Sequence, residues 1–296
     1  MSWLISALSA RALWAGSNLV DKALLEKYIR QPLLYLWVNG LVGLLPVVIV
    51  FWRPISWPST QLWPLLALTG CLSIYALLPY YRSLQLTEAS RVVPLWHLTP
   101  LIVLLFGFIL LHEVVGVSQI FGISCLASGG LLLAGDQLFP FKLNRAIGYM
   151  LLADLLYASE LLCVKYIYAT APNFATGLVW LSVSSALALI PSVLFKPWRQ
   201  GLWQHWQNLR PTVKSAALGN GVINLAAIAL NQFAIAQVAV ALASSVDATQ
   251  SLFVLGLSLL ASRRWPQIFN EHTTVKNIFL KLVAIVAIGL GLYFIV

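Results

Sequence analysis

The sequence has 296 residues, of which 60% are hydrophobic and only 9% are charged, and its formal net charge is +9. Soluble domains carry about 25% charged residues, and a soluble fold cannot keep so much apolar surface away from water. The composition therefore excludes a soluble protein and predicts an integral membrane protein. The basic residues lie in short loops between apolar segments, which indicates membrane orientation and not nucleic-acid binding.

Apolar segments follow one another along the chain, each close to the ~20 residues that a membrane-spanning helix needs. The first segment contains Arg11 and no small-residue cleavage site, so we interpret it as a retained helix. The longest connection, Lys196–Arg210, is rich in Trp and predicts an amphipathic interfacial segment. The ten predicted spans are 2–24, 33–52, 62–86, 91–111, 117–135, 146–168, 174–195, 211–235, 240–261 and 276–296.

The second half of the chain repeats the first. Leu13–Lys22 aligns with Leu156–Lys165 at an offset of 143, and an offset of 150 aligns spans three and four with spans eight and nine. Two repeats of five spans must have opposite orientations, and such inverted repeats place a binding site near the midplane. We therefore predict an all-α integral membrane fold of ten transmembrane helices, built as two inverted five-helix repeats over 1–140 and 141–296.

The segment Leu86–Gly135 carries a motif that resembles the EamA-type module of the drug/metabolite transporter superfamily. The residues that carry the resemblance are Ala89-Ser90, Pro94, Pro100, Glu113, Gly122 and Gly129, together with Trp14-Ala15-Gly16-Ser17 in span one. In the second half, Gln250 and Arg263 stand where Pro100 and Glu113 would repeat, so the motif is specific only in the first half. The resemblance implies ten helices, export or exchange of small metabolites, and often proton coupling.

Charged residues at membrane depth cost about 2.5–3.5 kcal/mol each on insertion scales, so they tend to face one another or a water-filled path. Arg11, Trp14 and Asn18 share one face of span one, and Asp154 and Tyr157 share a face of span six. Arg11 corresponds to Asp154 under the repeat offset of 143. We predict that the two form an ion pair or line one cavity, either as a substrate site or as a structural lock between helices.

Further polar side chains lie within the predicted spans. Asn220 and Asn224 share a face of span eight with Asn231, and they either line a pathway or hydrogen-bond neighbouring helices. Tyr75 offers an aromatic wall to a substrate or simply packs. The predicted substrate-binding residues are thus Arg11, Trp14, Asn18, Tyr75, Asp154, Tyr157, Asn220 and Asn224.

His97 in span four and Asp247 in span nine correspond under the offset of 150. A histidine changes charge readily between pH 5 and 8, so we predict these two as proton-coupling residues, against the alternative that each is a polar group satisfied by a neighbouring helix. Glu113 ends its helix near an interface and is predicted to be a cap or a latch between helices.

The basic residues also predict an orientation. The even-numbered connections contain only Arg53 and Lys165, so the positive-inside rule places the odd-numbered connections in the cytoplasm and both termini outside. The EamA resemblance implies the reverse. The odd-numbered connections hold Lys22, Lys27, Arg30, Arg82, Arg91, Lys142, Arg145, Lys196, Arg199, Arg210, Lys214, Arg263, Arg264, Lys276 and Lys281.

The sequence favours a secondary transporter of a small polar or amphiphilic metabolite over an enzyme. It contains no nucleotide-binding loop, and Cys71, Cys125 and Cys163 have no metal-ligand spacing, so no cofactor or metal is expected. The alternative is a membrane-embedded enzyme or flippase acting on a lipid-linked substrate. We expect a multi-pass cell-membrane protein (inner membrane if bacterial), monomeric or homodimeric, whose partners are a small-molecule substrate, lipid and protons.

Overall fold

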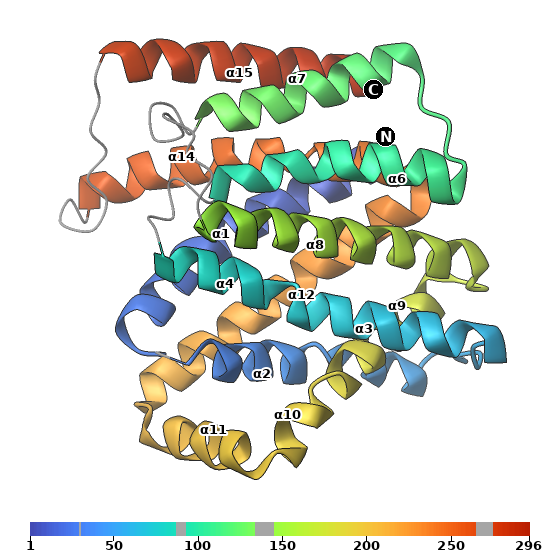
Figure 1. The fold of residues 1–296 in the computed structure, drawn as a ribbon, viewed down its shortest axis with the longest axis vertical. Coiled ribbons are helices and arrows are strands. Elements are labelled where there is room, and N and C mark those ends of the chain that lie inside the picture. Colours follow the sequence, from blue (N-terminus) through green and yellow to red (C-terminus); the bar gives the residue numbers. More distant parts are fainter. Residues whose placement is uncertain (30, 87–92, 134–144, 265–274) are drawn as a thin grey trace.

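The computed structural model describes residues 1–29, 31–86, 93–133, 145–264 and 275–296, and within them the secondary structure is helical (Figure 1). The elements are α1 Ser2–Lys27, α2 Pro32–Val42, η1 Leu45–Phe51, η2 Thr60–Leu62, α3 Trp63–Tyr75, α4 Leu77–Leu86, η3 Val93–Leu98, α6 Thr99–Leu111, α7 Val117–Leu133, α8 Arg145–Thr170, α9 Phe174–Leu187, α10 Ile190–Leu194, α11 Lys196–Asn208, α12 Pro211–Gln237, α13 Val240–Ser245, α14 Ala248–Arg264 and α15 Val275–Ile295.

Helical stretches coincide with all ten predicted spans in chain order, and α11 forms at the predicted interfacial segment. Five helical stretches are long and apolar enough to cross a bilayer by themselves. Helix α1 is also long enough, with 26 residues, but it carries several charged side chains. The protein is therefore a multi-pass membrane protein. The five stretches that are long and apolar enough are Leu33–Phe51, Thr60–Tyr80, Arg145–Thr170, Phe174–Leu194 and Pro211–Gln237.

Several predicted spans are broken where the sequence analysis expected continuous helices. Pro46 and Pro191 lie in the first turns of η1 and α10. Proline is tolerated there because a backbone N–H in the first turn has no partner within its own helix. It interrupts the preceding helix, because it cannot donate the hydrogen bond that would continue that helix. Span nine breaks between α13 and α14, and Asp247 lies in that break. Discontinuous helices at membrane depth are tolerated where they line a protein interior or a site.

The two halves of the chain pack against each other in a reciprocal pattern. In the first half, α1 packs on α12 and α14, while in the second half α8 packs on α3, α4 and α6. Likewise α2 packs on α12, α9 packs on α3, and α7 pairs with α15 along the top of Figure 1. The first helix of each half thus contacts the third and fourth spans of the other half.

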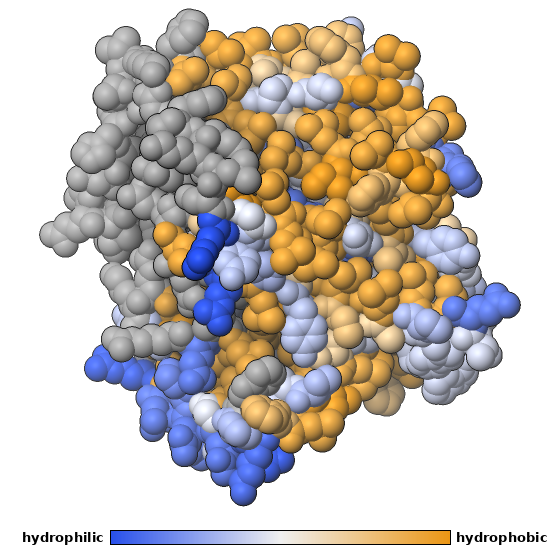
Figure 2. Space-filling model, in the orientation of Figure 1, coloured by the Kyte–Doolittle hydropathy of each residue, from blue (hydrophilic) through white to orange (hydrophobic). Residues whose placement is uncertain are grey.

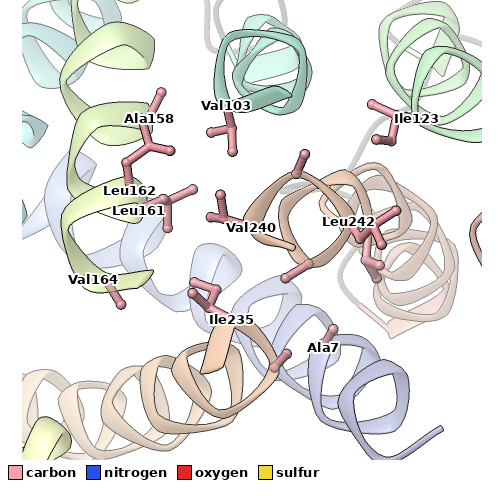
Figure 3. Packing of buried hydrophobic residues seen from close by; sticks show 14 of the residues in the cluster. Ala7, Val103, Ile123, Ala158, Leu161, Leu162, Val164, Ile235, Val240 and Leu242 are labelled. Carbon is pink, nitrogen blue, oxygen red and sulfur yellow. The ribbon is translucent and has the colours of Figure 1, made fainter. Parts of the chain in front are cut away.

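The largest apolar core surrounds α13. Figure 3 shows Val240 of this helix facing Leu162 of α8 and Val103 of α6, with Ile235 of α12 close by. All four side chains are buried. This core holds the short helix in place and thereby fixes the position of the break at Asp247.

Glycines allow α7 and α15 to approach closely. A Cβ at Gly122 would lie 2.9 Å from the carbonyl oxygen of Gly291, and a Cβ at Gly291 would lie 2.8 Å from that of Gly122. Backbone cannot move aside as a side chain can, so both positions require glycine. Small residues at such contacts are a common basis of helix association in lipid.

We expect Gly122→Leu to separate α7 from α15 and to reduce the yield of monodisperse protein severalfold, because the added side chain meets backbone. The matched control is Gly148→Leu in α8, where a Cβ would meet nothing within 4 Å. The measurement is the monodisperse fraction in size-exclusion chromatography after heating. Equal behaviour of the two variants would contradict the assigned role of the glycine contact.

The two termini lie near each other in the upper right part of Figure 1. Of the residues that carry the orientation prediction, Arg30, Arg91 and Lys142 lie outside the described part of the chain. Arg82, Arg145 and Arg199 are exposed. The prediction remains that the termini face outward.

A fluorescent reporter that folds only in the cytoplasm, fused after Val296, should therefore remain dark, while a phosphatase that is active only outside should be active. The same reporters fused after Asn208 should give the opposite pair of signals, because α11 lies in an odd-numbered connection. A bright fusion after Val296 would reverse the orientation.

Candidate substrate site

A buried ion pair joins the two halves of the chain. Arg11 on α1, only 1% exposed, pairs with Asp247 in the break between α13 and α14. Its Nη2 also donates to Oδ1 of Asn231 on α12 at 2.7 Å. The guanidinium lies 4.7 Å from the ring centre of Trp14. It also interacts electrostatically with the hydroxyl group of Tyr157 on α8. The cluster thus combines a paired charge, an amide and two aromatic side chains.

The predicted ion pair between Arg11 and Asp154 is wrong, because Arg11 pairs with Asp247, and the alternative that the two line one cavity stays a prediction. Helix α1 packs on α12 and α14, whereas α8 places Asp154 against α6. There the Thr99 hydroxyl donates to Asp154 Oδ1 at 3.0 Å, and Oδ2 has no hydrogen-bond partner among the described residues. Asp154 is fully buried. Among the described residues, the uncharged hydroxyl of Thr99 is therefore the hydrogen-bond donor to its carboxyl group.

His97 adjoins this cluster through Ser251. The His97 Nε2 and the Ser251 Oγ lie 2.8 Å apart, and Ser251 is one helical turn beyond Asp247. Nδ1 of His97 has no partner among the described residues. The imidazole therefore lies near Asp247 without a hydrogen bond to its carboxylate.

Aromatic rings lie beside the polar cluster. Trp96, which precedes His97, contacts Tyr157 with ring centres 5.4 Å apart and Tyr80 at 5.3 Å. Tyr157 thus lies near both the guanidinium of Arg11 and the ring of Trp96. Such rings can enclose the apolar part of a substrate.

The asparagines of α12 all turn toward α1, as their shared face predicts. Asn231 contacts Arg11, and Asn224 accepts a hydrogen bond from Ser17 at 2.8 Å. Asn220 donates to Asp21 at 2.6 Å. The stripe therefore runs along the contact between α1 and α12.

Sequence analysis missed the carboxylate network at the end of this stripe. The Tyr35 hydroxyl donates to Asp21, and Nδ2 of Asn220 lies 2.9 Å from the same hydroxyl. The network joins α1, α2 and α12. A signal was present in the sequence, because Asp21 lies four residues after Ser17 and seven after Trp14, on the face that was already identified.

Two other predicted substrate-binding residues, Tyr75 and Asn18, form no hydrogen bond with the Arg11–Asp247 pair among the described residues. Tyr75 donates to the carbonyl oxygen of Ala188 at 2.8 Å and packs in an apolar cluster with Leu189. Asn18 is exposed on α1, one turn from Trp14. Their roles in substrate binding remain predictions.

Glu113 acts as the predicted latch between helices. Its Oε2 accepts from the backbone N–H of Val240 at 2.9 Å, and its Oε1 lies 3.9 Å from Lys165. Lys165 also donates to the carbonyl oxygens of Ile235 and Val238, at 3.0 and 2.6 Å. Burial raises the pKa of the Glu113 carboxyl, while the Val240 hydrogen bond and Lys165 oppose this. The pair clamps the connection from α12 to α13.

Comparison with known proteins was consistent with the resemblance seen in the sequence. The model of the EamA-like transporter family matches residues 1–135. This part of the chain is therefore similar to the EamA-like transporter family. The match covers α1 to α7 and therefore includes Arg11, Trp14 and His97.

Individual proteins are also similar to this chain. One, from Sinorhizobium sp, is described as an uncharacterized transporter in the cobO 3′ region and is 36% identical over 83 residues, which are 28% of this chain. The match spans 59% of that relative's length. A solved structure, titled only as the crystal structure of a protein, superposes over 98% of this chain and 96% of its own, with a TM-score of 0.69 at 15% identity. That similarity shows a shared fold.

Proposed function

We propose that the protein is a secondary transporter that moves a small polar or amphiphilic metabolite across the membrane by alternating access. Its moving parts are two inverted five-helix repeats, 1–140 and 141–296, whose boundary lies outside the described residues. The substrate occupies the space beside Arg11, Asp247 and Trp14. The reaction involves no bond breaking, so the protein is not an enzyme.

The observation that carries this proposal is the buried Arg11–Asp247 pair. An ion pair inside a membrane protein is expensive, because desolvation of both charges offsets most of their attraction, and apolar residues would stabilise the fold as well or better. The pair takes one charge from each half of the chain. A role in function therefore explains its presence better than a contribution to stability does. Motion of one half against the other would open and close the pair.

The reciprocal packing of the two halves supports the inverted repeat. Helices α1 and α8 hold equivalent places, each against the third and fourth spans of the other half. A site between inverted repeats becomes accessible from either side in turn when one half rocks against the other. The break at Asp247 in span nine corresponds to the place in span four where the 3-10 helix η3 passes directly into α6, and discontinuous helices are typical of such sites.

Protons are the proposed coupling ion. The sequence has no nucleotide-binding loop, so uphill movement requires an ion gradient. His97 and Asp247 lie at corresponding positions, and the imidazole contacts Ser251, four residues after Asp247. Protonation of His97 would change the charge next to the Arg11–Asp247 pair and thereby bias it toward opening.

The test is counterflow in proteoliposomes. Vesicles loaded with one unlabelled compound of a metabolite panel (amino acids, amines, sugars, nucleosides and organic acids) are diluted into a trace of the same labelled compound. At least one compound should accumulate transiently above the level in protein-free vesicles. If folded protein exchanges none of them but alters a lipid-linked substrate, the alternative of a membrane enzyme or flippase replaces this proposal.

A further inference from the structure

Helix α11 packs one side against the bundle. Leu202 is 9% exposed and belongs to the same apolar cluster as Leu34, Tyr35 and Val213, and Trp206 packs against that cluster. The contacts fix α11 beside α2 and the first turns of α12. Figure 1 places α11 at the lower edge of the bundle, outside the other helices.

Exposed basic and aromatic side chains lie along the flank of α11 next to its packed side. Lys196 and Arg199 are exposed, as is Arg210 just after the helix, and Trp203 is 62% exposed. The chain from 196 to 214 contains no acidic residue. This region forms part of the hydrophilic lower edge in Figure 2, beneath a surface that is otherwise largely hydrophobic.

The chain crosses from apolar to basic surface within three residues. Leu194 and Phe195 are 76% and 54% exposed, as lipid-facing side chains are, and Lys196 follows directly. The basic flank of α11 therefore begins where the apolar surface ends, which is the level of lipid headgroups. Exposed Trp is typical of this interface.

We propose that α11 is a binding surface for anionic phospholipid headgroups. Basic clusters without acidic neighbours bind anionic lipid at the membrane surface, and amphipathic helices rich in Lys, Arg and Trp do so most readily. The apolar edge at Leu194 and Phe195 accommodates acyl chains, whereas a soluble anion would use only the charges. Because α11 shares its apolar cluster with Tyr35, bound lipid also stabilises the packing of α2 on α12.

The experiment uses the purified full chain in a neutral detergent, with dioctanoyl phosphatidylglycerol as the probe and dioctanoyl phosphatidylcholine as the neutral comparison. The test variant combines Lys196→Gln, Arg199→Gln and Arg210→Gln. The control removes the same charge from exposed positions elsewhere, with Arg53→Gln, Arg82→Gln and Arg145→Gln. Lipid binding is followed by native mass spectrometry and by the shift in melting temperature.

Phosphatidylglycerol should bind the wild-type protein and the control variant in preference to phosphatidylcholine, and should raise their melting temperatures. The α11 variant should lose about tenfold or more of this affinity. The preference of the wild-type protein should weaken as salt is added. Intact elution and helical content of the α11 variant would show that the loss is not unfolding.

Three outcomes would overturn the inference. Equal loss in both triple variants would mean that net charge alone attracts the lipid. Equal binding of the two lipids by the wild-type protein would mean that α11 does not distinguish an anionic headgroup from a neutral one. Full stabilisation by free glycerol phosphate at the same concentration would mean that the surface takes a soluble anion and not a lipid.

Discussion

Replacing Arg11 with methionine is expected to leave little folded protein in the membrane. Methionine fills a similar volume, but it leaves the carboxylate of Asp247 buried without its partner and leaves Asn231 without its donor. Breaking a buried pair in this way costs about 3–5 kcal/mol, which is a large part of the stability of a typical protein. Asp247→Asn should have a similar effect, because it leaves Arg11 unpaired.

The double variant Arg11→Met/Asp247→Asn separates structure from function. Removing both charges removes the uncompensated one, so folding should return to near the wild-type level. Exchange of substrate should not return. The measurements are monodisperse yield and counterflow in the same preparations. If the double variant recovers transport as well as folding, the pair is only a structural lock between the two halves.

His97→Gln is expected to uncouple transport from the proton gradient. Glutamine can keep a hydrogen bond to Ser251 but cannot bind or release a proton in the physiological range. Accumulation driven by a pH gradient should fall at least tenfold, while counterflow without a gradient continues. His97 is a better position for this test than Asp247, because a change at Asp247 also leaves Arg11 unpaired.

Ser251→Ala is the matched control for His97→Gln. It removes the 2.8 Å contact to the imidazole but leaves a titratable ring in place, so gradient-driven accumulation should persist. Undiminished accumulation in His97→Gln would remove His97 from the coupling mechanism. Equal loss of accumulation and counterflow would assign it to substrate binding or to structure.

The helices could be predicted from the sequence because lipid imposes a simple requirement on each of them. A span must be apolar over a fixed length, and its backbone must be paired internally. The breaks could not be predicted in the same way. Val246 and Asp247 leave the helix although neither is Gly or Pro, and the surrounding core of α13 fixes this conformation through tertiary contacts.

The candidate site could be predicted only in part. Helical spacing gave the correct face of α12, because the angle between residues on one helix is fixed. The partner of Arg11 depends on which helices of the other half are adjacent, and the repeat offset alone does not reveal this. Asp154 and Asp247 lie in the first and fourth spans of the proposed second repeat, and only the packing of α1 on α14 decides between them.

The central claim is that one site beside Arg11 is reached in turn from both sides of the membrane. Asn18 is exposed on α1 and shares the face of Arg11 and Trp14, so a single cysteine at this position reports on the site. Cys71, Cys125 and Cys163 are first replaced by alanine, and a membrane-impermeant maleimide is applied to right-side-out and to inverted vesicles. Labelling should occur in both, and a transported compound should slow both rates. Labelling from one side alone, whether or not the compound is present, would contradict alternating access.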